Sequence, residues 1–218
     1  MPCKLVILIS GSGSNLQAFI DAANQGELPA DIAAVISNRP AAGGLERAAQ
    51  AGIATAVVDH TGFANRDDFD AALRDTIDSF APDLVVLAGF MRILGADFVR
   101  HFRGRMLNIH PSLLPKYPGL HTHQRAIDAG DTEAGATVHF VTEELDGGPP
   151  ILQAQVPVKA GDTAELLAAR VLEQEHRIYP LAARWFAEGR LTLNGNQAEL
   201  DDNALPPTGF PFHCVTAD

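Results

Sequence analysis

Residues 4–15 read Lys-Leu-Val-Ile-Leu-Ile-Ser-Gly-Ser-Gly-Ser-Asn, and this stretch indicates the fold class. The apolar run up to Ser10 does not alternate, which predicts a strand buried on both faces, as in a parallel sheet covered by helices. Gly11–Asn15 predicts a tight turn, and apolar residues then recur at helical spacing from Leu16 to Ala23. A strand, a turn and a helix in this order favour an α/β domain.

The same alternation of strand and helix continues along the first half of the chain. Further strands are expected at 32–37, 54–58, 84–88 and 106–109, with helices after the turn at 38–40 through about Ala51 and at 67–80. We therefore expect a doubly wound, mostly parallel, Rossmann-like sheet with helices on both faces. After residue 135, runs at 137–141 and 151–158 predict an antiparallel strand pair. A long helix should follow from about Asp162 to Trp185, with Gly189 ending it.

The size and composition of the chain exclude several classes of protein. At 218 residues, we expect one domain spanning 1–218, with a loosely ordered, proline-rich tail from Pro206. There is no apolar run of about 18 residues and no signal-peptide pattern. The net charge of −11 disfavours nucleic-acid binding. Cys3 and Cys214 lie near opposite ends without CxxC spacing, so we expect reduced thiols and a cytoplasmic location.

Residues 108–115, Asn-Ile-His-Pro-Ser-Leu-Leu-Pro, carry the strongest indication of a site. Asn108 and His110 are two positions apart, so on a strand they share one face. Pro111 has no N–H and cannot extend an interior ladder, which places the pair at the carboxyl end of the strand. Open α/β sheets bind their ligands at that end. Asp146, in Leu-Asp-Gly-Gly-Pro, is the expected acidic partner, although each of the three residues alone is also common in a structural role.

The glycine turn at 11–15 favours a phosphate monoester over a dinucleotide. The third glycine of the dinucleotide fingerprint is replaced by Leu16, and Asn38 and Arg39 stand where an acidic residue would hold a ribose. There is no Walker lysine either. Backbone N–H groups at a helix amino terminus stabilise a phosphate. A turn without a ligand is the alternative.

Other polar residues give weaker indications. His121 and His123 suggest a metal site, but no carboxylate or cysteine lies at suitable spacing. We therefore expect no metal and assign both histidines to loop packing and to hydrogen bonds that support the residues around them. Arg66, Arg92 and Lys116 are candidate anion contacts, with a solvated surface position as the alternative. Glu175, on the predicted long helix, is a candidate acceptor from a hydroxyl or amine, with a plain surface position as the alternative.

Together these motifs resemble the phosphoribosylglycinamide formyltransferases, the folate-dependent enzymes of purine synthesis. The resemblance covers residues 4–209 and is carried by residues 9–15, 86–94, 107–123, 144–149, 174–176 and 179–180. The Asn-x-His-x-Ser-Leu-Leu-Pro motif is shared by a wider set of formyl-transferring and formyl-hydrolysing folate enzymes. Three further motifs narrow the match to the phosphoribosylglycinamide formyltransferases: the glycine turn at 11–15, Gly-Leu-His-Thr-His at 119–123 and Gln-Glu-His at 174–176. Ser12 departs from the many members that have Asn there.

The resemblance implies direct formyl transfer from 10-formyltetrahydrofolate, as cosubstrate, to the amine of phosphoribosylglycinamide. It assigns Asn108 as hydrogen-bond donor to the formyl oxygen, His110 as general acid and Asp146 as its electrostatic partner and proton relay. The phosphate would be bound by Gly13, Ser14 and Asn15, and the ribose by Glu175. The folate would be bound by Arg66, Met91, Arg92, Ile93, Leu94, Asn108, Thr142, Glu143, Glu144, Leu145 and Asp146.

The first half, about 1–100, would thus bind phosphate, and the second, about 101–209, would carry catalysis and folate binding, leaving 210–218 as a tail. We expect small-molecule partners, no membrane, and a monomer or weak homodimer. Three alternatives stay open: a formyltetrahydrofolate hydrolase, a non-enzymatic phosphate- or nucleotide-binding module, and an NAD(P) dehydrogenase. A formyltransferase acting on initiator tRNA is disfavoured by the length and acidity of the chain.

Overall fold

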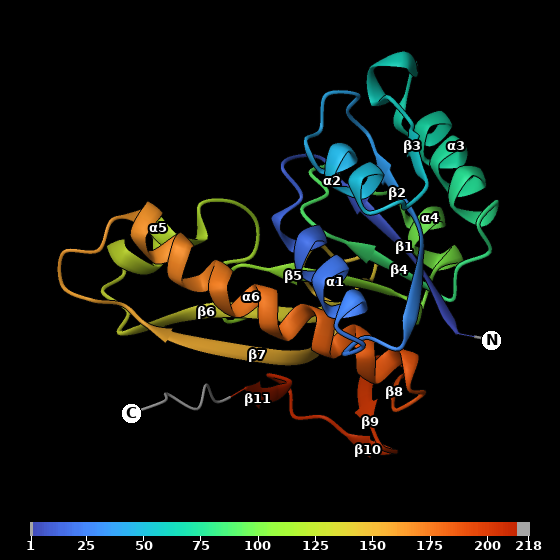
Figure 1. The fold of residues 1–218 in the computed structure, drawn as a ribbon. Helices are drawn as coiled ribbons and strands as arrows, with labels where there is room; N and C mark the ends of the chain where they lie inside the picture. Colours follow the sequence, from blue (N-terminus) through green and yellow to red (C-terminus); the bar gives the residue numbers. More distant parts are fainter. Residues whose placement is uncertain (1, 213–218) are drawn as a thin grey trace.

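The apolar run at the start of the chain forms β1 (Cys3–Ile9), an interior strand of an eight-stranded sheet (Figure 1). The structure is a computed structural model, and it describes residues 2–212. In β1, Leu5, Ile7 and Ile9 pack into one apolar cluster, while Val6 and Leu8 pack into a second cluster on the opposite face. Both faces of the strand are therefore buried, as its uninterrupted apolar sequence predicts.

The order of the large sheet is β11-β7-β6-β5-β4-β1-β2-β3. All neighbouring pairs are parallel except β5–β6 and β6–β7, which are antiparallel. The mostly parallel sheet with an antiparallel pair in its C-terminal part is confirmed. The other strands of this sheet are β2 (Ala30–Ser37), β3 (Thr55–Val57), β4 (Leu84–Leu87), β5 (Met106–His110), β6 (Glu133–Phe140), β7 (Pro150–Pro157) and β11 (Phe210–Phe212).

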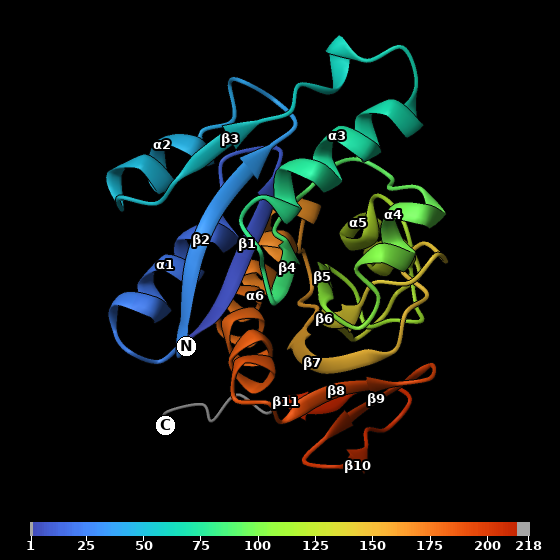
Figure 2. The same cartoon turned by 90° about the vertical axis from the view of Figure 1, so that its right-hand side faces the viewer.

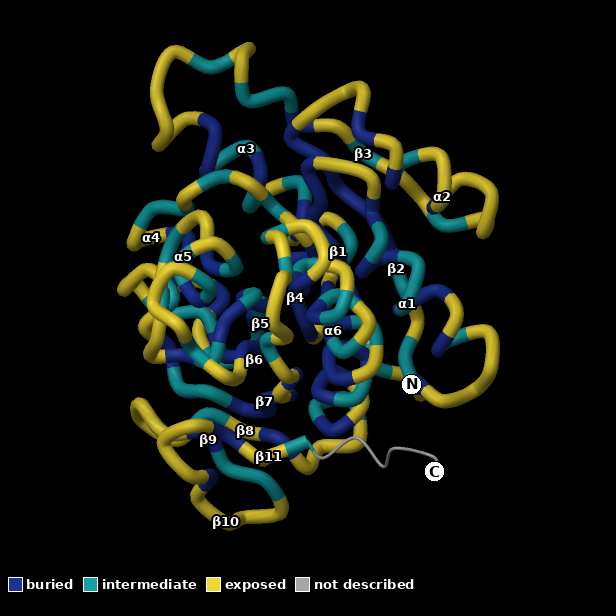
Figure 3. Tube along the Cα trace, turned by 90° about the vertical axis from the view of Figure 1, so that its left-hand side faces the viewer, coloured by how far each residue is buried: buried dark blue, intermediate teal, exposed yellow. Residues whose placement is uncertain are grey.

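Helices cover both faces of the sheet (Figure 2). Residues of α1 and α6 belong to one apolar cluster, and residues of α3 and α4 belong to the other. The burial of the central strands contrasts with the exposed outer loops (Figure 3). The helices are α1 (Ser14–Asn24), α2 (Gly44–Gln50), α3 (Arg66–Asp78), α4 (Ala96–His101), α5 (Thr122–Asp128) and α6 (Ala164–Ala187), with a 3₁₀ turn, η1 (His60–Gly62).

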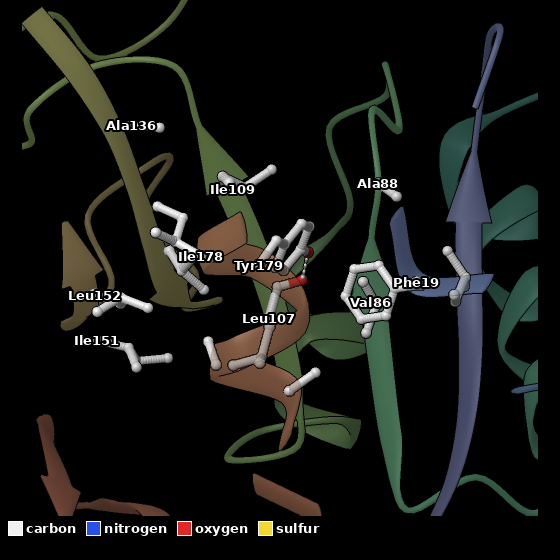
Figure 4. Close-up of a cluster of buried hydrophobic side chains, with 14 of the residues drawn as sticks. Phe19, Val86, Ala88, Leu107, Ile109, Ala136, Ile151, Leu152, Ile178 and Tyr179 are labelled. Carbon is white, nitrogen blue, oxygen red and sulfur yellow. Dashed lines mark hydrogen bonds between the residues drawn. The ribbon is translucent and has the colours of Figure 1, made fainter. Parts of the chain in front are cut away.

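The long helix α6 connects the core to the strands that carry the polar motif. Tyr179 is fully buried, and its hydroxyl lies 2.9 Å from the carbonyl oxygen of Leu87 in β4 and 3.0 Å from that of Leu107 in β5. Its ring packs edge-on against Phe19 of α1, with ring centroids 5.1 Å apart (Figure 4). Tyr179 therefore connects α1 and α6 to the neighbouring strands β4 and β5.

Several elements differ from the sequence expectations. The helices α4 and α5 and the small antiparallel sheet of β8 (Leu191–Asn194), β9 (Gln197–Leu200) and β10 (Asn203–Ala204) were not predicted. The expectation of a loose tail from Pro206 is wrong for Phe210–Phe212, because β11 pairs in parallel with β7 and the Phe210 ring packs against Trp185. The rest of the tail, 213–218 with Cys214, lies outside the described residues.

None of the helices within residues 2–212 has the length and apolar character needed to cross a membrane.

Candidate active site

A cavity of about 690 Å³ opens at the carboxyl ends of β4 and β5, beside the start of α1. The strand order reverses there, because the chain runs from β1 outward to β2 and β3 but returns to β4 on the other side of β1. A sheet of this kind has its crevice at such a switch point. The lining includes Asn15, Asn108, His110, Glu175, Asp146 and the segments 89–94, 119–123 and 141–146.

The strand β5 presents Asn108 and His110 to this cavity. Leu107 and Ile109 alternate with them and belong to the cluster on the opposite face of the sheet. His110 is the last residue of the strand, and Pro111 follows it outside the ladder. The prediction that these two side chains share a face at the carboxyl end of a strand is confirmed.

Asp146 reaches the same point from the loop between β6 and β7. Its Oδ2 lies 3.5 Å from His110 Nδ1, with only 7% of the histidine side chain and 9% of the aspartate side chain exposed. The backbone N–H of Gly119 donates to the same oxygen over 2.9 Å. Gly148 lies against the backbone of this loop's other end, where an added Cβ would lie 1.8 Å from the carbonyl oxygen of Phe140, so a larger residue would displace the loop.

The other ring nitrogen of His110 fixes the position of its proton. Nε2 lies 2.8 Å from the carbonyl oxygen of Tyr117. A carbonyl can only accept, so Nε2 carries a hydrogen and donates it. Nδ1 therefore faces Asp146, and the protonated ring presents a second N–H toward a buried carboxylate. A histidine whose ring nitrogen faces a carboxylate at such a distance is placed to pass a proton in acid–base catalysis.

The amide of Asn108 is oriented by His139, a residue that the sequence analysis missed. The two residues are paired in the β5–β6 register. Nδ1 of His139 donates to the carbonyl oxygen of Phe140, so Nε2 is an acceptor and must face the NH₂ group of Asn108, 3.2 Å away. Full burial lowers the pKa of His139 to about 4, which keeps the ring neutral. The second N–H of Asn108 is thus available to a ligand.

A second polar pair lies near the glycine turn. The side-chain NH₂ of Asn15 donates to Glu175 Oε2 over 2.8 Å, joining α1 to α6. Burial raises the pKa of Glu175, while the hydrogen bond from Asn15 acts in the opposite direction. Oδ1 of Asn15 is buried and has no protein partner, so it can accept from a ligand. This pair lines the same cavity as His110.

The turn itself approaches α2 closely. Gly13 has a φ of 74°, and an added Cβ would lie 2.8 Å from Cα of Gly44. Ser14 begins α1 and lines a neighbouring cavity of about 460 Å³ between α1 and α6, not the larger cavity. The structure therefore places Asn15 at the larger cavity, with Gly13 and Ser14 directly beside it in the chain.

Apolar side chains surround the mouth of the larger cavity. Four large apolar residues line the cavity although they are 59–68% exposed to solvent: Met91, Ile93, Leu120 and Leu145. Exposed apolar groups that share one opening are typical of a binding groove. The predicted folate segments 91–94 and 142–146 both line it.

Arg66 takes a different position from the other predicted folate residues. It begins α3 and does not line the cavity. It lies near Asp70, whose Oδ2 accepts from the backbone N–H of Gly95 over 2.7 Å. Burial raises the pKa of Asp70, against the influence of Arg66 and Arg92. The guanidinium of Arg92, which does line the cavity, lies 4.6 Å from the centre of the Phe69 ring.

The family model described as formyl transferase matches residues 3–183, and the chain belongs to this family. It is an enzyme of the transferase class. It is 59% identical over 207 residues to phosphoribosylglycinamide formyltransferase of Escherichia coli strain K12, with 95% of this chain and 98% of that protein covered.

Solved structures agree in fold. The phosphoribosylglycinamide formyltransferase of Coxiella burnetii, solved in complex with CHES, has a TM-score of 0.94 and 53% identity, covering 98% of this chain and all of that one. A formyltetrahydrofolate deformylase from Burkholderia mallei has a TM-score of 0.83 and 30% identity, covering 92% of this chain and 70% of that one. The Rossmann-like formyltransferase fold is thereby confirmed.

Proposed function

We propose that this protein transfers the formyl group of 10-formyltetrahydrofolate to the primary amine of phosphoribosylglycinamide, in purine biosynthesis. The observation that carries the proposal is the convergence of Asn108, His110 and Asp146 at the floor of a cavity with an apolar mouth. The similarity to phosphoribosylglycinamide formyltransferases along nearly the whole chain supports the same substrates.

In the proposed mechanism, the amine of the acceptor attacks the formyl carbon directly. A C–N bond forms, and negative charge develops on the formyl oxygen in the tetrahedral intermediate. The available N–H of Asn108 stabilises that oxygen as a hydrogen-bond donor, and the positive charge of the protonated His110 ring stabilises it electrostatically. One such donor contributes about 2.7–4 kcal/mol to lowering the barrier.

Proton transfer then completes the reaction. The bond from the formyl carbon to the folate nitrogen breaks, and a proton lost by the attacking amine is delivered to that leaving nitrogen. His110 supplies the acid, and Asp146 stabilises the imidazolium and relays the proton. No covalent enzyme intermediate is required. Ser112 is not a suitable nucleophile, because its hydroxyl is buried and donates to the carbonyl oxygen of Lys116 over 2.6 Å.

The substrate contacts are part of the proposal. Gly13, Ser14 and Asn15 bind the phosphate at the start of α1, where helix N–H groups favour an anion. Glu175 accepts from the ribose hydroxyls, supported by its position beside Asn15. Segments 91–94 and 142–146 hold the folate. Arg66 contacts the glutamate tail of the folate, outside the cavity at the start of α3.

The proposal also covers partners and location. We assign small molecules as the only ligands, with no metal, and a monomer or weak homodimer in the cytoplasm. Within residues 2–212, no cluster of histidine, cysteine and acidic side chains is arranged to hold a metal ion. The acidic net charge of −11 supports the exclusion of nucleic acid. Light scattering of the purified protein checks the oligomeric state.

A formyltetrahydrofolate hydrolase is the second candidate, since a deformylase shares the fold. It would use the same three polar residues with water as the nucleophile. One experiment separates the candidates: folate absorbance is followed with purified protein and 10-formyltetrahydrofolate, with phosphoribosylglycinamide present or absent. We expect tetrahydrofolate to form only with the acceptor. Turnover without the acceptor would indicate a hydrolase, and no turnover in either case would leave a binding module.

A further inference from the structure

A short segment, Tyr117–Leu120, contacts both members of the His110–Asp146 pair. We call these four residues the strap. The carbonyl oxygen of Tyr117 accepts from His110 Nε2 over 2.8 Å, and the backbone N–H of Gly119 donates to Asp146 Oδ2 over 2.9 Å. The strap therefore sets the ring orientation of the histidine and the position of the carboxylate through two backbone groups.

The same segment is held from its other side by Arg125 of α5. Nη1 of Arg125 donates to the carbonyl oxygen of Pro118 over 2.6 Å and to that of Leu120 over 3.3 Å. The guanidinium also lies 5.1 Å from the centre of the Tyr117 ring. Backbone groups of the strap thus alternate, with Tyr117 and Gly119 bonded to the catalytic pair and Pro118 and Leu120 bonded to one arginine.

Asp131 holds the first residue of the strap. Its Oδ2 accepts from the Tyr117 hydroxyl over 2.9 Å, and its two oxygens lie 3.0 and 3.1 Å from Nζ of Lys116. Only 18% of the Asp131 side chain is exposed. The carboxylate therefore ties down two adjacent residues at the point where the chain enters the strap.

The backbone of the strap needs such support. Tyr117 has a φ of 55°, and His121, directly after the strap, has a φ of 58°. Both lie in the left-handed region, which residues with a Cβ rarely adopt, so the surroundings must hold them there. The contacts from Arg125 and Asp131 supply that restraint.

We propose that Arg125 and Asp131 are positioning residues for the transfer reaction. They act through the strap, keeping the Tyr117 carbonyl on His110 Nε2 and the Gly119 N–H on Asp146. Neither residue contacts reacting atoms. The inference rests on the proposed function, because it assigns to His110 and Asp146 the roles given above.

The main test compares Arg125→Met, which removes the donor, with Arg125→Lys, which keeps a cation and one donor group. We expect Arg125→Met to lower kcat between about 10-fold and 100-fold, as displaced catalytic groups do. The KM for phosphoribosylglycinamide should stay unchanged, since its proposed contacts come from α1 and α6. Arg125→Lys should recover part of kcat. The matched control is Arg184→Met on α6, which removes an ion pair with Glu188 and should leave kcat within about twofold.

Two variants of Asp131 separate the effect of its hydrogen bond with Tyr117 from the effect of its ion pair with Lys116. Asp131→Asn keeps an oxygen that accepts from the Tyr117 hydroxyl but loses the charge beside Lys116, whereas Asp131→Leu loses both. We expect Asp131→Leu to lower kcat as Arg125→Met does, and Asp131→Asn to retain most of it. Wild-type kcat in both Arg125→Met and Asp131→Leu would overturn the proposal.

A spectroscopic readout tests the geometry independently of turnover. In protein labelled with ¹⁵N-histidine, the Nε2–H of His110 should be visible by NMR and slow to exchange with water, because it is buried and bonded to Tyr117. We expect this signal to be lost or shifted in Arg125→Met and unchanged in Arg184→Met. An unchanged signal in Arg125→Met would overturn the proposal. If the wild type transfers no formyl group, the proposed function fails, and this signal still decides whether Arg125 positions His110.

Discussion

Asp146 is the residue whose charge the proposed chemistry needs most. Its carboxylate lies 3.5 Å from His110 Nδ1 and is nearly shielded from solvent. Asp146→Asn keeps the shape but removes the carboxylate that faces His110 Nδ1 and that relays the proton in the proposed mechanism. We expect kcat to fall by about 10²–10⁴-fold, the usual contribution of general acid–base catalysis. Kinetics give kcat, and calorimetry should show that phosphoribosylglycinamide still binds with wild-type affinity.

The control for this variant is Asp128→Asn at the exposed end of α5, where the carboxylate accepts from Gln124. It should leave kcat unchanged. Near-normal turnover of Asp146→Asn would refute the role given to Asp146, and loss of acceptor binding would assign that residue to binding instead of catalysis.

His139 makes the stability of the protein depend on pH. Burial lowers its pKa in the folded protein to about 4, whereas an unfolded histidine titrates near 6.5. Between these two values the unfolded chain binds a proton that the folded chain does not, so the free energy of unfolding decreases as the pH falls. The full decrease is on the order of 3 kcal/mol.

Urea titrations of wild type and His139→Gln at pH 7, 5.5 and 4.5 measure this effect. The variant retains all other titratable groups, so the difference between the two proteins removes their contributions to the pH dependence. One of these groups is Glu175, whose raised pKa makes the free energy of unfolding increase as the pH falls. We expect the stability of the wild type to decline relative to the variant as the pH falls. Equal pH dependence in both proteins would contradict the buried, neutral state of His139.

Among the elements, α6 positions the carboxyl ends of β4 and β5 through Tyr179. Tyr179→Phe keeps the ring among its neighbours but removes the hydroxyl that contacts Leu87 and Leu107. We expect the free energy of unfolding to fall by about 1–2 kcal/mol, the cost of losing a buried hydrogen bond. Denaturation in urea measures it. The control is Ser79→Ala, which removes an exposed hydroxyl and should lower the free energy of unfolding by less than about 0.5 kcal/mol. Equal losses in the two variants would show that the buried contacts of the Tyr179 hydroxyl do not stabilise the protein.

The elements that the sequence predicted are those with strong local patterns. Strands buried on both faces, such as β1 and β4, read as uninterrupted apolar runs, and α6 shows helical spacing over 24 residues. The helices α4 and α5, of 6 and 7 residues, are too short for periodicity to identify. The strand β11 is held by pairing with β7 and by Trp185, both remote in sequence, so its local composition misleads.

For the candidate site too, the residues that the sequence predicts are those placed by a local pattern. Asn108 and His110 lie on one strand, and the period of a strand alone places them together. His139 could be found only from the β5–β6 register, in which it is opposite Asn108. Arg125 and Asp131 act on the strap through contacts that no local spacing encodes. Arg66 was assigned by resemblance, and its contact with the folate tail stays a prediction.

At the scale of the whole molecule, the two substrates should bind to one continuous surface, since Asn15 and Glu175 share a cavity with His110. Each substrate at 100 times its Kd should raise the free energy of unfolding by about 2.7 kcal/mol. Thermal denaturation with each ligand measures this stabilisation. NAD at the same concentration should produce no shift, and a shift with NAD alone would favour a dehydrogenase.

The central claim is that the formyl group passes directly from donor to acceptor at Asn108, His110 and Asp146. A single turnover with donor labelled in the formyl carbon, quenched in acid, tests this claim most directly. We predict that all transferred label appears in the formylated acceptor, and that His110→Asn abolishes the transfer. Label recovered on the protein would contradict direct attack, and label recovered as formate would contradict transfer itself.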